Sequence, residues 1–389
     1  GVWAELGDAP LAVAMEHLVT LANVTTSSLA AGNAADMQAA YRTSGWQADD
    51  AMLRALAAIA SDADLTAVTA VLNTVYVPWA NDAARHLQKV VHADGYPRRQ
   101  DDEKTEKEFS DGTCFMFIDG LRFDVAMRLQ EQLEARGVTL ASEVTWAALP
   151  SVTSTAKPAV TPVRHLVTGQ DVNSDFTASV AETGESLTSH RFQKLLEQCG
   201  WQKLGKAENG DPDGRAWCEM GDIDHEGHER GWKLARHIDA LIKEAAERVE
   251  QLLAAGWKSI RIVTDHGWLL MPGGLPQSKL DASLSDNKWG RCAALKSGSS
   301  TSERQYPWHW NPTQSFALPD GIKCYRKREY SHGGISLQEC VNLMLTATGS
   351  TGKTASSVTI ESIEWQGLRC RVSLSGSVDD LELDIRTLA

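Results

Sequence analysis

Short apolar runs alternate with segments of helical periodicity between residues 113 and 348, and this alternation restricts the fold more than any other feature. Residues 113–118 and 259–264 are apolar runs of strand length, typical of strands that are buried on both faces. Residues 123–135 and 231–255 carry apolar side chains at helical spacing. Strands that alternate with helices predict an α/β fold with a mixed, mostly parallel sheet flanked by helices.

Further segments extend this pattern. We expect a strand-like segment over 138–149, a helix over 192–199, a short strand over 217–220 and a helix over 336–348. The segment 274–319 is long and rich in Ser, Trp and Pro, so we expect an elaborated loop over one end of the sheet.

The chain divides by composition into four parts. Residues 1–95 carry Ala-rich segments with apolar residues three and four apart, which predicts a helical region in which Pro78 breaks or kinks a helix. Residues 96–112 are charged and almost free of aliphatic side chains, so we expect an exposed linker. The α/β domain then covers 113–350, and the β-like alternation of 356–389 predicts the start of a C-terminal β domain.

Composition excludes several classes of protein. The 38 Lys and Arg against 51 Asp and Glu give a net charge of −13, which argues against a protein that coats duplex nucleic acid electrostatically. No apolar run reaches the roughly 20 residues that span a bilayer, so we expect a cytoplasmic protein without membrane contact. The seven cysteines are widely spaced without a C-x-x-C pair, which favours neither a disulfide framework nor a thiolate zinc site.

Five places in the α/β region put carboxylates, imidazoles or hydroxyls just beyond an expected strand or in a loop. They are Asp119, the hydroxyl cluster around Thr153, the pair Asp224 and His228, the pair Asp265 and His266, and His332. Ligands of open α/β sheets bind at the carboxyl ends of the strands, so chemistry is expected there. Each feature taken singly also has a structural explanation, because Asp and Thr often cap helices and charged loops are often merely solvated.

Two of these places are more informative than the others. Asp265 and His266 close a strand together, and two polar groups at a buried strand exit need a partner. The run 221–229 combines four acids with two histidines, and oxygen plus imidazole ligands suit Zn²⁺ or Mn²⁺ better than Ca²⁺.

The order of the five elements resembles the two-metal site of the alkaline phosphatase superfamily. Nucleotide pyrophosphatases and phosphodiesterases of that superfamily share a strand Asp, then P-x-x-T, D-x-x-G-H, D-H-G and a final His. The corresponding residues here are Asp119, 150–153, 224–228, 265–267 and His332. The resemblance implies an alkaline-phosphatase-like fold and a metal-dependent phosphodiesterase or phosphatase.

Further residues are similar to the PglZ family of bacterial phage-exclusion (BREX) systems. They lie at 117–124 (FIDGLRFD), 149–153 (LPSVT), 288–292 (KWGRC) and 330–339 (YSHGGISLQE). The resemblance covers residues 75–349 and implies that 113–350 is a PglZ-like catalytic domain that works with other phage-defence proteins. Members of that family are longer, so we expect this chain to be a piece of a longer protein.

The resemblance also implies two divalent metal ions, with zinc favoured over manganese or magnesium. The residues implied for one ion are Asp119, Thr153, Asp265 and His266; those for the other are Asp224, His228 and His332. Thr153 would be the nucleophile and form a phosphothreonine, because a bound dication stabilises an alkoxide.

Alternatives remain inside the motifs. Asp222 is an alternative to Asp224, and His225 to His228, although the D-x-x-G-H spacing favours the latter pair. Ser151 and Ser154 flank Thr153 and are its rivals as nucleophile.

Several cations and aromatic residues could contact a substrate. Lys323, Arg326 and Arg328 precede His332 closely and could neutralise phosphates. Arg122 and Arg291 could grip phosphate oxygens at two points. The tryptophans 289, 308 and 310 could stack on bases, although buried packing is favoured for at least two of them.

These residues together predict a phosphodiesterase or nuclease that acts on nucleotides or nucleic acid in phage defence. The alternatives are a phosphomonoesterase with the same ligands, and a docking protein without enzyme activity that keeps the metals for structure. The absence of the C/S-x-P-x-R signature near Thr153 disfavours a sulfatase.

Overall fold

The computed structural model describes residues 9–97, 109–169, 173–281, 283–296, 298, 301, 303–349, 359–366 and 369–375. The chain forms two compact units, Gly1–Thr348 and Gly349–Ala389. The predicted linker at 96–112 lies mostly outside the described residues, and the four predicted parts of the chain stay a prediction.

Helices make up the described chain up to residue 94. They are α2 (Pro10–Thr25), α3 (Ala34–Ala40), the π-helical turn η1 (Tyr41–Gly45), α4 (Trp46–Ala58), α5 (Asp62–Thr74) and α6 (Tyr76–Asp94). Asn33 and Ser61 accept hydrogen bonds from the first free N–H groups of α3 and α5, which fixes where these helices begin. Pro78 lies in the first turn of α6, where its missing N–H costs nothing, so the predicted break falls at Val75.

The central sheet has six strands and confirms the predicted α/β class. Its spatial order is β2 (Thr139–Trp146), β14 (Val341–Thr348), β7 (Ser259–Val263), β1 (Thr113–Phe117), β6 (Arg215–Glu219) and β5 (Trp201–Leu204). The pairs β7–β1, β1–β6 and β6–β5 are parallel, whereas β14 runs antiparallel to both of its neighbours. The sheet is therefore mixed and mostly parallel, as predicted.

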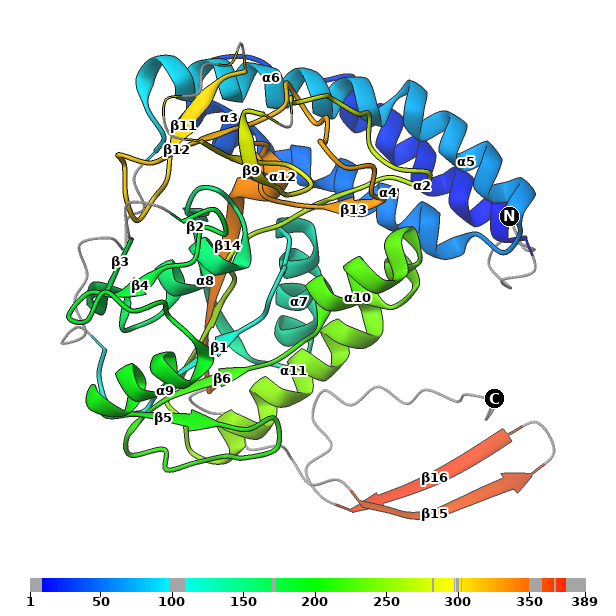
Figure 1. Cartoon of the computed structure of the whole chain (residues 1–389). Coiled ribbons are helices and arrows are strands. Elements are labelled where there is room, and N and C mark those ends of the chain that lie inside the picture. Colours follow the sequence, from blue (N-terminus) through cyan, green and yellow to red (C-terminus); the bar gives the residue numbers. More distant parts are fainter. Residues whose placement is uncertain are drawn as a thin grey trace. The chain divides into compact units, whose positions relative to one another are not determined.

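Helices cover both faces of this sheet (Figure 1). On one side lie α7 (Phe123–Ala135) and α11 (Ile238–Ala254), and on the other α8 (Thr153–Val160) and α9 (Ser189–Gln198). Successive residues of β1 point to opposite faces, so Cys114 joins the core under α7 and α11, and Phe115 joins the core with α9. Burial on both faces explains why β1 is apolar at every position.

The predicted helix over 336–348 is wrong. Only α12 (Leu337–Cys340) is helical, and Val341–Thr348 forms strand β14. Apolar residues in this segment fit a buried strand as well as a helix, and the tertiary structure supplies hydrogen-bonding partners on both edges, β2 and β7. The predicted helix over 231–255 is also interrupted, because Gly231–Arg236 is a 3₁₀-helix (η5) that precedes α11.

The segment expected as a long loop contains a small antiparallel sheet of four strands. These strands are β9 (Ser285–Lys288), β10 (Ala293–Leu295), β11 (Gln305–Pro307) and β12 (Ser315–Ala317). The segment is fixed to the N-terminal helices, since the Tyr306 hydroxyl donates to the carbonyl oxygen of Gln88 at 3.0 Å.

Short elements complete the described chain. They are η4 (Arg164–Leu166), the paired strands β3 (Val167–Thr168) and β4 (Ser179–Val180), helix α10 (Ile223–Arg230), and the paired strands β8 (Leu269–Leu270) and β13 (Tyr330–Ser331). The second unit contains an antiparallel hairpin of β15 (Thr359–Gln366) and β16 (Arg369–Ser375). None of the helices in the described part of the chain combines the length and apolar character needed to cross a bilayer.

Candidate metal centre

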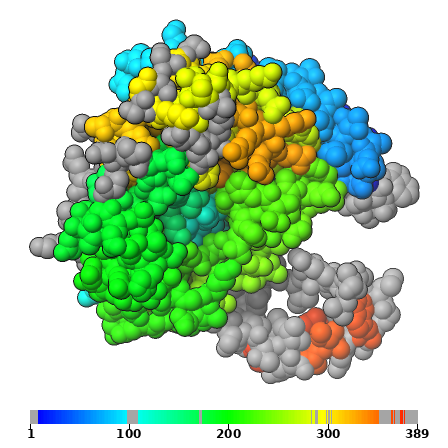
Figure 2. Space-filling view, in the orientation of Figure 1, coloured from blue at the N-terminus to red at the C-terminus, as the bar shows by residue number. Residues whose placement is uncertain are grey.

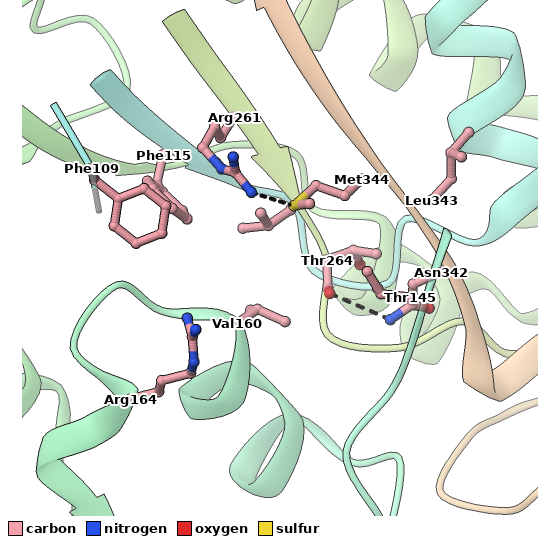
Figure 3. A pocket seen from close by; sticks show the side chains of 11 residues that line it. Phe109, Phe115, Thr145, Val160, Arg164, Arg261, Thr264, Asn342, Leu343 and Met344 are labelled. Atoms are coloured by element: carbon pink, nitrogen blue, oxygen red, sulfur yellow. Dashed lines mark hydrogen bonds between the residues drawn. The ribbon is translucent and has the colours of Figure 1, made fainter. Parts of the chain in front are cut away.

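The two central parallel strands deliver three of the predicted ligands to one edge of the sheet. Asp119 follows β1, and Asp265 and His266 follow β7, whose last residue Val263 lies beside Phe117 at the end of β1. Asn342 of β14 donates from Nδ2 to the carbonyl oxygen of Thr264 at 3.4 Å (Figure 3). The same Nδ2 donates to the carbonyl oxygen of Asp265 at 3.0 Å. Strand β14, which the sequence predicted to be helical, therefore holds the backbone that carries two of the predicted ligands.

The glycine of the D-H-G element is required by close packing. A Cβ atom on Gly267 would lie 2.1 Å from the carbonyl oxygen of Gln338. Any larger residue would push the exit of β7 away from the start of α12, and with it the neighbouring Asp265 and His266.

The remaining predicted residues arrive from three other segments. Asp224 and His228 lie one turn apart on α10, which follows β6. His332 follows β13, and β13 pairs with β8 just after His266. Thr153 is the first residue of α8, after the turn that leaves β2. Figure 2 shows this face hollowed between the green α8–α9 side, the lime α10 and the orange segment around β13.

The first cluster forms around His266. Its Nε2 lies 3.5 Å from Oδ2 of Asp265, 3.8 Å from Oδ1 of Asp119 and 3.2 Å from Oγ1 of Thr153. Potential ligand atoms of Asp119, Asp265 and His266 all lie within 4.8 Å of one another. This spacing can hold one metal ion with the Thr153 hydroxyl beside it.

The second cluster forms around Asp224. Its two carboxylate oxygens lie 3.4 Å from Nε2 of His332 and 3.5 Å from Nε2 of His228, and these two nitrogens are 3.2 Å apart. The rings of His332 and His266 stack with centroids 4.0 Å apart, so the two clusters adjoin. Potential ligand atoms of Asp224, His266 and His332 also lie within 4.8 Å of one another.

The backbone sets the orientation of two imidazoles. Nδ1 of His266 lies 3.1 Å from the carbonyl oxygen of Gly267, and Nδ1 of His332 lies 3.0 Å from that of Ser151. A carbonyl only accepts, so Nδ1 of each neutral ring carries the proton and Nε2 keeps its lone pair. Both lone pairs face the clusters, in the tautomer that metal-ligating histidines use.

The carboxylates of the first cluster fit a divalent cation. Oδ1 of Asp119 and Oδ2 of Asp265 are buried, and neither has a hydrogen-bond partner among the described residues. A buried carboxylate oxygen without a partner is costly, and a bound cation would remove that cost for both atoms. The residues present therefore suit metal ions held by oxygen and imidazole nitrogen.

The pKa values of two carboxylates of the site shift in opposite directions. Burial, followed by the charges of Asp265 and Asp224, raises the pKa of Asp119 well above its usual value. Burial also raises the pKa of Asp224, but the surrounding histidines, His332 first, outweigh burial and lower it overall. Negative charge thus accumulates around Asp119, where a cation would be most stabilising.

The structure separates the alternatives that the motifs left open. Asp222 is exposed and pairs with Lys206 at 2.9 Å, whereas Asp224 lies 3.4 Å from Nε2 of His332. It is His228, not His225, whose Nε2 lies 3.2 Å from the same nitrogen. Ser151 donates to the carbonyl oxygen of Gly334, and Ser154 to that of Asp175. Thr153 is thus the hydroxyl that lies beside His266.

Two arginines predicted to grip phosphate are instead structural. Arg122 is fully buried and forms a two-point ion pair with Asp124, at 2.6 and 2.8 Å. Arg291 is fully buried and pairs in the same way with Glu339, at 3.0 and 2.9 Å. Their donors are already used inside the protein, so neither guanidinium can hold a substrate phosphate.

Two cavities adjoin the metal centre on different sides. One of about 320 Å³ is lined by His228, His332, Trp289, Arg326 and Arg328. The other, of about 290 Å³, is lined by Thr153, Lys157, Phe192, Lys203 and Glu219. The third predicted cation, Lys323, is half-buried and lies outside the lining of both cavities.

The three tryptophans of the long segment have different surroundings, and one of them, Trp308, is buried. Trp308 is fully buried and donates from Nε1 to Oγ1 of Thr155, and Trp310 donates to the carbonyl oxygen of the same residue. Both brace the helix that begins with Thr153. Trp289 alone among the three lines the cavity beside His332.

Two residues of the site were missed at the level of sequence. The Tyr330 hydroxyl donates to Oδ1 of Asp224 at 2.9 Å, and the glycine at 227 leaves room for the Tyr330 ring, since a Cβ there would lie 2.3 Å away. Lys157 lies one turn after Thr153 on α8 and pairs with Glu219 at 2.8 Å. The i, i+4 spacing of Lys157 from Thr153 is the signal that could have found it.

Comparison with known proteins gives distant structural likenesses. No family model and no curated protein sequence matches the chain. Murine ectonucleotide pyrophosphatase/phosphodiesterase 5 aligns with a TM-score of 0.41 and 12% identity, over 61% of this chain and 88% of that chain. An inactive variant of it in complex with AMP gives 0.39 and 12%, over 62% and 88%. The human protein gives 0.38 and 10%, over 61% and 87%.

Proposed function

We propose that this chain is a two-metal phosphoester hydrolase of the alkaline phosphatase type, with Thr153 as its nucleophile. The observation that supports this most directly is the position of the Thr153 hydroxyl, 3.2 Å from Nε2 of His266 and beside the unpartnered carboxylate oxygens of Asp119 and Asp265. A hydroxyl next to a cation site is poised for ionisation. The motif order supports the same assignment, and zinc is the favoured metal.

Each group of residues has a defined task in this proposal. Asp119, Asp265 and His266 hold one ion, and Asp224, His228 and His332 hold the other. The ions supply Lewis-acid stabilisation of negative charge at this edge of the sheet. Tyr330 fixes the carboxylate of Asp224, and Gly267 and Ser151 fix the rings of His266 and His332 through their carbonyl oxygens.

The reaction proceeds in two displacements at phosphorus. The Thr153 hydroxyl loses its proton to solvent, its Oγ–P bond forms, and the P–O bond to the leaving group breaks, with the electron pair staying on the leaving oxygen. Water then displaces Thr153 from the phosphothreonine and regenerates the hydroxyl. Thr153 begins α8, so the positive end of the helix favours negative charge on Oγ.

The two cavities favour a diester over a monoester. A phosphodiester carries a substituent on each side of phosphorus, and the metal centre has one cavity on the Thr153 side and another on the His228 side. Nucleotides or nucleic acid are the substrate class that the cations and aromatic rings of these cavities suit. A role in phage defence together with other BREX proteins rests on the PglZ-like motifs and is part of the proposal.

The test combines elemental analysis with two chromogenic substrates. We expect bound zinc and turnover of bis-p-nitrophenyl phosphate that exceeds turnover of p-nitrophenyl phosphate. A marked preference for the monoester would favour the phosphomonoesterase instead. Bound metal without turnover of either ester, with a Thr153→Ala variant still active in phage exclusion, would establish the docking role in place of the enzyme.

A further inference from the structure

We infer that the cavity beside His228 and His332 is a leaving-group subsite for a nucleotide that carries its own phosphate, as in single-stranded nucleic acid. This inference rests on the proposed function and adds a direction to it. It assigns which substituent of the scissile phosphorus each cavity holds.

The direction follows from the position of the nucleophile. In phosphoryl transfer the attacking and leaving oxygens lie roughly in line on opposite sides of phosphorus. Thr153 lies at the His266 side of the centre and lines the second cavity. His228 lies beyond His332, at 3.2 Å between their Nε2 atoms, and both line the first cavity. The leaving group therefore departs past His332 into the cavity walled by Arg326 and Arg328.

The charges of this cavity suit an anionic leaving group. Arg326 and Arg328 are exposed, and neither has an ion-pair partner within the part of the chain that the structure describes. Unpaired cations gathered at one wall stand out in a chain of net charge −13. The cations of the second cavity are two lysines, Lys157, which pairs with Glu219 at 2.8 Å, and Lys203. A guanidinium binds a phosphate at two points whereas an ammonium acts as a point charge, so the two arginines make the His228 side the better site for an additional phosphate.

The remaining wall suits the sugar and base of a nucleotide. Trp289 and Tyr330 line the cavity, and flat aromatic side chains stack on bases without selecting among them. The carboxylate of Asp175 also lines it and can accept a hydrogen bond from a sugar hydroxyl or a base amino group. The volume of about 320 Å³ lies in the range of small-molecule sites.

The kinetic test compares two diesters that differ in their leaving groups. The leaving group of a short oligothymidylate is a nucleotide that bears a second phosphate. The leaving group of bis-p-nitrophenyl phosphate is nitrophenolate, which bears none. In Arg328→Ala and in Arg326→Ala, kcat/KM for the oligothymidylate should fall about ten-fold further than kcat/KM for the small diester. Lys327→Ala is the matched control, because it removes an exposed cation that does not line the cavity.

The second test measures binding and does not depend on turnover. In the Thr153→Ala background, the affinity for a dye-labelled oligothymidylate is followed by anisotropy over a range of salt concentrations. Log affinity falls as log salt rises, and each of the two arginine variants should make this negative slope less steep by about 0.7, the value for one phosphate contact to a single strand. Trp289→Leu should weaken binding at an unchanged slope, because stacking releases no counterions.

The outcomes separate the subsite from the proposed function. Unchanged substrate ratios and slopes in both arginine variants would overturn the subsite, and so would an equal loss in Lys327→Ala, which would indicate a diffuse field. If the parent protein hydrolyses neither diester, the proposed function fails, and the binding slopes still decide whether the cavity takes a nucleotide.

Discussion

Nδ1 of His332 lies 3.0 Å from the carbonyl oxygen of Ser151, two residues before Thr153. The Ser151 hydroxyl donates in return to the carbonyl oxygen of Gly334, at 2.8 Å. These two contacts join the turn that carries the proposed nucleophile to the loop that carries a proposed ligand of the second ion. The nucleophile and the second metal site are thus positioned by one shared piece of backbone.

Removal of the Thr153 hydroxyl should abolish turnover and leave the fold and the metal in place. We expect Thr153→Ala to lower kcat for bis-p-nitrophenyl phosphate by at least about 10³-fold, because no other hydroxyl contacts the imidazole of His266 among the described residues. Thr153→Ser should recover a substantial part of the rate. Ser154→Ala is the matched control, since its Oγ is turned to the carbonyl oxygen of Asp175, and an equal loss there would contradict the assignment.

Loss of a carboxylate of the first cluster should remove metal as well as activity. Asp265 is fully buried and has an unpartnered Oδ2 in the first cluster, so Asp265→Ala should lower the zinc content measured by elemental analysis and abolish turnover.

Chelation should lower the thermal unfolding midpoint of the parent protein, because metal binds the folded state only and stabilises it by about 2.7 kcal/mol at 100 times Kd. Asp222→Ala, outside both clusters, should retain its metal. An equal metal content in Asp265→Ala and in the parent would remove Asp265 from the ligand set.

The buried pair of Arg291 and Glu339 should matter for stability. Glu339 also accepts hydrogen bonds from the backbone N–H of Gly334 and from the Ser336 hydroxyl, so the pair fixes the loop that carries His332. Arg291→Ala should lower the free energy of unfolding by about 3–5 kcal/mol, because it leaves a buried carboxylate unpaired. The exposed pair of Arg304 and Asp320 is the control, and Arg304→Ala should cost less than about 1 kcal/mol in urea unfolding. Comparable losses in the two variants would contradict the structural role of Arg291.

A buried carboxylate in the helical region should make stability depend on pH. Burial raises the pKa of Asp49 to about 6, while Tyr41 and Tyr76 donate hydrogen bonds to it. A raised folded-state pKa means that the stabilisation is complete below the unfolded value of 3.8 and is lost as pH rises through about 6. This loss amounts to up to about 3 kcal/mol.

The measurement is the free energy of unfolding of the parent and of Asp49→Asn across this pH range. The stability of the parent relative to the variant should decrease from about pH 4 to about pH 6 and stay level above it, because the amide does not titrate. Parallel curves for the two proteins would show that Asp49 keeps an ordinary pKa in the folded state.

The elements best predicted from sequence are those whose pattern of apolar residues fits a single type of secondary structure. Strand β1 is apolar at every position because both faces are covered, and α7 has the predicted bounds of 123–135 because its apolar residues repeat at helical spacing. Strand β14 was predicted as a helix because its apolar run fits either structure. Its pairing with β2 and β7 involves residues up to about two hundred positions away, which no local pattern contains.

The sequence by itself determined which residue types are offered for the proposed chemistry and in what order they follow the strands. Parallel strands bring their carboxyl ends to one edge of the sheet whatever the loops do. Only the tertiary structure shows that Thr153, and neither serine neighbour, contacts His266, and that Asp224 lies beside His332, because these contacts depend on which side chain turns toward each imidazole. It also placed Arg122 and Arg291 in buried ion pairs. A guanidinium pairs with the nearest carboxylate, and the carboxylate that ends up nearest to it is set by folding.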